Sequence, residues 1–200
     1  MDKRILNKAH EMFLKYGIRS VSMDEIAAQL GISKKTIYQY YADKDALVED
    51  VINAEINVNE ERCENSKQIS ENAIHEVMLA VESISVILKA MNPSLLNDLE
   101  KYHPIAHKKL IDHKYKFLSA VIKDNLQRGI EQGLYKPEIN TDILARYRIA
   151  TIFLVFNGEV FQTNKITNVV EEITDNFLYG LATTKGNKLI EKYINQRNKK

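Results

Sequence analysis

Apolar residues recur every three or four positions along almost the whole chain, which is the spacing of amphipathic α-helices. Regular alternation of apolar and polar residues between turn signals, the pattern of strands, is absent. Only 3 prolines and 7 glycines interrupt the 200 residues. The pattern therefore predicts an all-α protein.

The first fifty residues divide into short helical segments with recognisable ends. Ser22 and Glu25 form a capping-box pattern, in which each side chain satisfies a free backbone N–H at a helix start. Gly31 is expected to end that helix, because glycine takes the left-handed conformation of a tight turn without steric cost. Ser33 and Asp43 are expected to cap the two helices that follow. Two short helices joined by a glycine turn predict a helix-turn-helix.

The second helix of this motif exposes a polar face. Ile37 and Tyr41 are one turn apart and are expected to point inward. At about 100° per residue, Lys35 and Gln39 then point most directly outward. Donors and hydroxyls on such a face suit base edges and phosphates in the major groove of double-stranded DNA.

Lys44 adds a cation beside the free N–H groups at the start of the next helix, where anions bind readily. An ordinary solvated helix face remains the alternative, because short helix-turn-helix patterns also arise by chance. The candidate DNA-binding residues are Ser22, Ser33, Lys34, Lys35, Thr36, Tyr38, Gln39, Tyr40 and Lys44.

The remaining residues continue the helical pattern and predict a bundle. A long helix is expected from Pro104 through Ile130, and another over residues 141–160. The stretch IATIFLVF within the latter is apolar on every side, which predicts burial in a core or between subunits. The stripe Val169, Ile173, Phe177 and Leu181 is a second candidate interface, with the core of the monomer as the alternative.

The expected organisation has three parts. Residues 1–48 form the helix-turn-helix domain, residues 49–185 a helical ligand-binding and dimerisation domain, and residues 186–200 a basic tail. A solvated, frayed end is the favoured interpretation of the tail, over contact with DNA or membrane.

The charge composition limits the kinds of partner that the protein can bind. The 28 basic and 27 acidic residues leave a net charge of +1, so the chain has no strong overall positive charge. A nucleic acid would therefore have to bind to a local basic patch on the surface. Residues 1–48 carry eight basic and six acidic side chains, which predicts modest, salt-sensitive nonspecific DNA affinity. The N-terminus does not resemble a signal peptide, and the longest apolar run is too short to span a bilayer. We expect a soluble cytoplasmic protein without a membrane partner.

Catalytic, cofactor and metal motifs are not found in the sequence. Cys63 is the only cysteine, which excludes an internal disulfide or a cysteine-cluster zinc site. His103 and His107 have the spacing of metal ligands on a helix, but Pro104 between them is expected to leave His103 outside that helix. A di-iron bundle needs two Glu-x-x-His motifs, and only Glu100 with His103 fits. The protein is predicted to be neither an enzyme nor a metal or cofactor carrier.

Residues 5–52 resemble the DNA-binding domain of the TetR (tetracycline repressor) family of bacterial transcription regulators. The matching stretches are ILNKAHEMFLKYG and SVSMDEIAAQLGISKKTIYQYYADKDALVEDVI. The resemblance implies that Tyr38 and Lys44 contact phosphate and that Tyr41 is a buried aromatic, where the family usually has phenylalanine. Positions 34, 35, 36, 39 and 40 vary with operator sequence, so the bases that are read do not follow.

The resemblance further implies a homodimer whose two penultimate long helices form a four-helix interface. It also implies a repressor on a palindromic operator, released by a small-molecule effector in the middle helices. For each candidate pocket residue, ordinary core packing is the alternative. The candidate ligand-binding residues are Met78, Met91, Tyr102, His103, His107, Tyr115, Tyr147, Phe153 and Phe156. The alternative function is a helical protein-interaction module whose degenerate helix-turn-helix no longer binds DNA.

Overall fold

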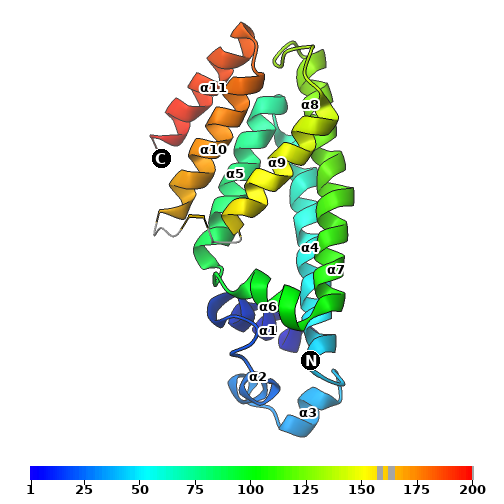
Figure 1. The fold of residues 1–200 in the computed structure, drawn as a ribbon. Helices are drawn as coiled ribbons and strands as arrows, with labels where there is room; N and C mark the ends of the chain where they lie inside the picture. Colours follow the sequence, from blue (N-terminus) through cyan, green and yellow to red (C-terminus); the bar gives the residue numbers. More distant parts are fainter. Residues whose placement is uncertain (157–159, 162–164, 200) are drawn as a thin grey trace. The chain divides into compact units, whose positions relative to one another are not determined.

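The computed structural model describes residues 1–156, 160–161 and 165–199 (Figure 1). These residues form an all-α fold, as predicted. The one β feature among them is an isolated antiparallel bridge between Tyr135 and Ala182. No helix in the described ranges combines the length and apolarity needed to cross a membrane. The helices in chain order are α1 (Asp2–Tyr16), α2 (Met23–Leu30), α3 (Lys34–Tyr38), α4 (Lys44–Ile69), α5 (Ala73–Ala90), α6 (Leu95–Tyr102), α7 (Pro104–Asp112), the π-helix η1 (His113–Leu118), α8 (Ser119–Glu131), α9 (Thr141–Phe156), α10 (Ile166–Leu181) and α11 (Thr184–Arg197).

The chain divides into two compact units. Unit 1 contains Met1–Asn59 and Ala90–His113, and unit 2 contains Glu60–Lys89 and Lys114–Lys200. Helix α4 begins in unit 1 and ends in unit 2, so one continuous helix belongs to both.

Unit 1 builds one core under the N-terminal helices. The core has fully buried side chains from α1, α2, α3, α4 and α6, which include Ile5, Ile26, Ile37, Leu47 and Leu99. Helices α2 and α3 have only eight and five residues, so burial of their apolar faces, rather than intrinsic helix propensity, stabilises them.

Helices α6 and α7 are fastened to the rest of unit 1 by polar contacts. The Arg19 backbone N–H donates to Asp98 Oδ2 at 3.0 Å, which holds the loop after α1 to α6. Lys109 Nζ on α7 lies 2.6 Å from Glu49 Oε1 on α4. His103 forms the junction between α6 and α7 and lies outside both helices, as its position before proline predicts.

Unit 2 has a separate core between α5, α8, α10 and α11. Its buried residues include Ile74, Leu126, Leu178 and Ile190. A close approach between α8 and the following loop requires glycine, because a Cβ on Gly129 would lie 2.0 Å from Tyr135 Cδ2. No other residue type leaves room for this ring.

Three sequence-based expectations need correction. Residues 186–200 were expected to fray, but α11 forms there and buries Ile190 and Tyr193, because these residues supply an apolar stripe that covers unit 2. The prediction of a frayed tail was wrong. The single helix expected from Pro104 is interrupted by η1, whose wider turn differs too little from an α-helical turn for apolar spacing to reveal.

The third correction concerns the stripe on α10. Phe177 and Leu181 are buried in the core of unit 2, so the monomer-core alternative applies to these two residues rather than an interface. Helix α9 is described to Phe156, and residues 157–159 of the expected 141–160 helix lie outside the described residues.

Candidate nucleic-acid interface

The helix-turn-helix is set by local hydrogen bonds at its ends. Ser22 and Glu25 make the predicted capping box at the start of α2: the Ser22 backbone N–H donates to Glu25 Oε2 at 2.7 Å, and the Glu25 N–H donates to Ser22 Oγ at 3.2 Å. Gly31 ends the helix with φ 65° and ψ 31°, the left-handed conformation. These predicted ends are confirmed.

Helix α3 begins at a second serine cap. Ser33 Oγ accepts from the Thr36 backbone N–H at 3.1 Å, and the two side-chain oxygens are 2.8 Å apart. Five residues form the helix, but Gln39 keeps helical angles (φ −73°, ψ −23°), so the helical direction continues past Tyr38. The two serine caps fix the residues at which α2 and α3 start.

The inward face of α3 is the one predicted. Ile37 is 0% exposed and Tyr41 is 4% exposed. The Tyr41 hydroxyl donates to Asp2 Oδ1 at 2.7 Å. The pKa of Tyr41 is raised, mainly by burial and also by the hydrogen bond to Asp2. A buried hydroxyl with a partner costs little, which explains how tyrosine is accommodated in the core here.

The opposite side of the motif is polar and open to solvent. Lys34 Nζ lies 2.8 Å from Asp24 Oδ2 and 5.9 Å from the Tyr38 ring, and the hydrogen bond to Asp24 raises the pKa of Lys34. Both partners of this ion pair are mostly exposed, so it contributes little stability and can yield to a phosphate. Of the nine candidates, Thr36 and Lys44 are half-buried and the following are exposed: Ser22, Ser33, Lys34, Lys35, Tyr38, Gln39 and Tyr40.

Lys44 has a structural partner that the sequence did not indicate. Its Nζ donates to the backbone carbonyl of Ile18 at 2.6 Å and lies 6.0 Å from the Phe13 ring. Burial lowers the pKa of Lys44. Asp43 caps the same helix, accepting from the Ala46 N–H at 2.8 Å. An ammonium has three donors, so the bond to Ile18 leaves capacity for a phosphate oxygen.

The candidate ligand-binding residues are scattered. Met78 belongs to the core of unit 2, while Met91 packs against the core of unit 1. The side chains of Tyr102, Tyr115 and Tyr147 are exposed.

The other four candidates also have separate surroundings. His103 Nδ1 lies 2.6 Å from Asp45 Oδ1, and His107 is half-buried. Phe153 and Phe156 are half-buried, and their ring centroids lie 5.9 Å apart. Among the described residues, no group of three His, Cys, Asp or Glu side chains has the geometry of a metal site.

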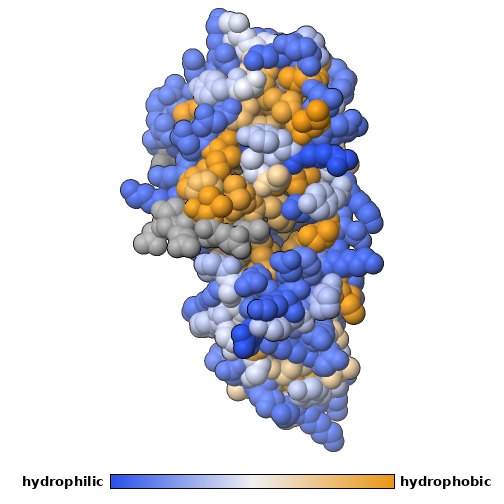
Figure 2. Space-filling model, viewed as in Figure 1, coloured by the Kyte–Doolittle hydropathy of each residue, from blue (hydrophilic) through white to orange (hydrophobic). Residues whose placement is uncertain are grey.

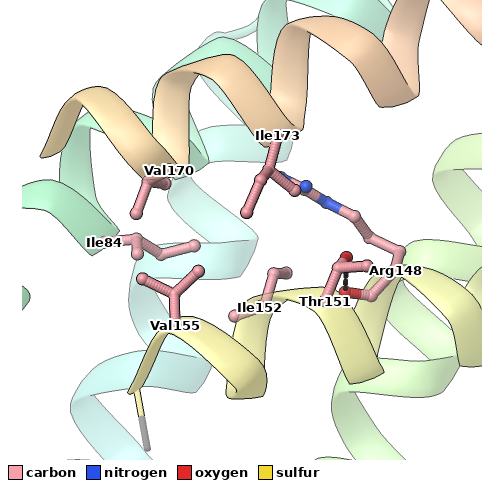
Figure 3. A pocket seen from close by; sticks show the side chains of 7 residues that line it. All are labelled: Ile84, Arg148, Thr151, Ile152, Val155, Val170 and Ile173. Carbon is pink, nitrogen blue, oxygen red and sulfur yellow. Dashed lines mark hydrogen bonds between the residues drawn. The ribbon is translucent and has the colours of Figure 1, made fainter. Parts of the chain in front are cut away.

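Unit 2 instead contains a small hollow that none of those nine residues lines (Figure 3). Its free volume is about 10 Å³, enough for one water molecule at most. Its lining residues are Ile84, Arg148, Thr151, Ile152, Val155, Val170 and Ile173. Sequence reasoning missed Arg148, although a cation placed four residues before Ile152 in an apolar helix was the available signal.

Comparison with known proteins finds HTH-type transcriptional regulators among the relatives of this chain. The profile of a family described as "Bacterial regulatory proteins, tetR family" matches residues 5–51. The HTH-type transcriptional regulator YvaF of Bacillus subtilis (strain 168) is 31% identical over 193 residues, which cover 91% of this chain and 96% of that protein. The HTH-type transcriptional regulator UidR of Escherichia coli (strain K12) is 26% identical over 149 residues, 72% of this chain and 73% of its own.

Solved structures with the same fold include a TetR-family transcriptional regulator from Agrobacterium tumefaciens. Its TM-score is 0.76 at 16% identity, covering 91% of this chain and 97% of that chain. A transcriptional regulator from Cytophaga hutchinsonii ATCC 33406 gives a TM-score of 0.73 at 23% identity, covering 90% and 98%. At these identities the likeness establishes the fold.

Proposed function

Because the chain belongs to the TetR family of bacterial transcription regulators, we propose that it is a cytoplasmic homodimeric repressor which a small molecule releases from DNA. Its relatives are transcriptional regulators, and proteins of this family bind DNA. In addition to DNA binding, we propose for this chain a homodimer, repression of transcription and release from DNA by a small molecule.

The observation that carries DNA binding is the outer face of α3. The capped start of the helix and the buried Ile37 hold Lys35 and Gln39 outward, and both are exposed. Lysine suits guanine O6 and N7, and glutamine suits adenine N6 and N7. We assign base reading to these two residues, and phosphate contact to Tyr38 and Lys44.

A homodimer is supported by apolar side chains on one side of α9. Ile143, Tyr147 and Leu154 are 63%, 54% and 41% exposed, and their spacing of four and seven residues places them on one face of the helix. Hydrophobic residues also gather over this part of unit 2 in Figure 2. A row of this kind is a recognised mark of a protein–protein interface, and a second copy of the chain would cover it.

Dimerisation would match the protein to a palindromic operator. Two recognition helices must enter successive major grooves about 34 Å apart, so each half-site is read by one protomer. Helix α4 starts at Lys44 in unit 1 and ends at Ile69 in unit 2. A ligand in unit 2 that moves this helix would change the spacing of the two recognition helices, to the extent that it binds the two states differently.

Selection from a random pool of duplex DNA tests the proposal. The full chain should enrich a palindrome, and a Lys35→Ala variant should enrich a site with one position per half-site relaxed. Asn7→Ala, at an exposed α1 position, is the matched control and should enrich the unchanged site. Failure to enrich any sequence, with a folded protein, would favour the protein-interaction module instead.

A further inference from the structure

Arg148 is a buried cation in an apolar part of unit 2. It lies on α9 and is 5% exposed. Its Nη2 donates to Thr174 Oγ1 on α10 at 2.7 Å, and its guanidinium carbon lies 5.2 Å from the centre of the Phe177 ring. Within the described residues no carboxylate forms an ion pair with it. Burial lowers the pKa of Arg148 to about 10, so the group still carries its charge at neutral pH.

A buried charge without a counter-ion is costly to keep. Removing an ion from water has a large free-energy cost unless an opposite charge and hydrogen bonds offset it. Thr174 is neutral, and its hydroxyl already donates to the Val170 carbonyl at 2.7 Å. Guanidinium carries five N–H donors, of which Thr174 accepts from one. Among the described residues, the Arg148 guanidinium thus has unused N–H donors and no counter-ion, which favours the binding of an anion.

The rest of the hollow has aliphatic walls. In Figure 3 the side chains of Ile152 and Val155 on α9 point toward those of Val170 and Ile173 on α10. Ile84 of α5 lines the same hollow. The Thr151 hydroxyl is turned to the Arg148 backbone carbonyl, to which it donates at 2.9 Å. These walls suit a hydrocarbon body rather than a polar one.

We propose that Arg148 anchors the carboxylate of an aliphatic acid whose chain lies among these isoleucine and valine side chains, and that such acids are the effector class. This inference rests on the proposed release of the protein from DNA by a small molecule. A planar carboxylate matches the guanidinium fork with two parallel hydrogen bonds. A single negative charge neutralises Arg148, whereas a phosphate dianion would leave a net charge buried.

Entry of the acid requires movement. The hollow holds about 10 Å³, so α9 and α10 must separate to admit a chain of several carbons. This requirement links binding to a change of structure in unit 2, because the acid binds only the separated state.

Calorimetric titration of the DNA-free protein with hexanoate and with 1-hexanol tests the site. The two probes share a chain and differ in the charged head. We expect one hexanoate to bind per chain. Hexanoate should bind roughly ten- to hundredfold more tightly than hexanol, because only its carboxylate can form charge-assisted hydrogen bonds with Arg148. Equal affinity for both probes, or no binding of hexanoate, would overturn the proposal, and neither result needs a variant.

Two arginines on the same helix provide a matched pair of variants. Arg148→Gln should remove the preference for hexanoate, while Arg146→Gln, at an exposed position two residues earlier, should keep it. Equal loss in both variants would assign the preference to general charge rather than to Arg148. Suppose instead that the wild type binds hexanoate and hexanol equally and that Arg148→Gln is a monomer. The role of Arg148 would then be to stabilise the dimer interface.

Operator affinity is measured separately, with and without hexanoate. Weaker operator binding in hexanoate, absent in Arg148→Gln, is the expected result. Binding of hexanoate at Arg148 without a change in operator affinity would overturn the effector assignment while leaving the site in place. Absence of operator binding in every condition would refute the proposed function instead.

Discussion

Two lysines in the DNA-binding region should respond differently to the same substitution. Lys44→Met keeps an unbranched stem near Phe13 but removes the ammonium that donates to the Ile18 carbonyl at 2.6 Å. A hydrogen bond from a charged group contributes about 1.5–3 kcal/mol. Because Lys44 is half-buried and water can replace it at the carbonyl, we expect a loss of about 1–2 kcal/mol in unfolding free energy.

The effect of Lys44→Met on DNA should be independent of sequence. Losing one phosphate contact per protomer lowers the slope of log affinity against log salt by about 0.9 for each contact. Lys35→Met, at an exposed position on α3, should leave stability within about 0.5 kcal/mol. It should instead reduce discrimination by about 1–3 kcal/mol at one base pair per half-site.

Urea unfolding followed by circular dichroism measures the stability of both variants. Fluorescence anisotropy with the selected duplex and a scrambled duplex, over a range of salt, measures the DNA terms. The assignment of roles is refuted if Lys44→Met changes sequence preference, or if Lys35→Met weakens both duplexes equally. Either result would mean that α3 lies in the groove with a different rotation.

Three further outcomes follow from the structure. Hydrogen bonds within the capping box lower the pKa of Glu25, so its stabilisation is present above the unfolded-state pKa of about 4.3 and is lost as the pH falls through the lower folded-state pKa. The difference in unfolding free energy between wild type and Glu25→Gln should shrink with acidification, and a constant difference would contradict this. Leu154→Lys should give monomers by light scattering, while Val86→Lys, at another exposed apolar position on α5, should remain dimeric. Gly129→Ala should cost about 1–3 kcal/mol in thermal unfolding because its Cβ would overlap the Tyr135 ring, and an unchanged melting temperature would count against that packing.

Features set by neighbouring residues could be read from the sequence. The capping box of Ser22 with Glu25 and the left-handed Gly31 depend on hydrogen bonds and backbone angles within a few positions. The inward direction of Ile37 and Tyr41 depends on helical periodicity alone. These features also determine which side of α3 is exposed, so the candidate DNA-binding face was predictable.

Features set by distant segments could not be read in the same way. The bond from Lys44 to Ile18 joins positions 26 residues apart, and the burial of Arg148 depends on α10 lying beside α9. Helix α11 was mistaken for a frayed tail because its many lysines and polar residues outweigh a short apolar stripe. Apolar spacing shows that a face is buried but does not show against which segment.

A hydroxyl-radical footprint on the selected duplex tests the central claim most directly. If two protomers read DNA with α3, the protein should protect two patches on one face of the duplex, centred about 10–10.5 base pairs apart. Protection should weaken at both patches together as salt is raised. A single protected patch, or a footprint with no fixed position on the selected site, would contradict recognition by a dimer through α3.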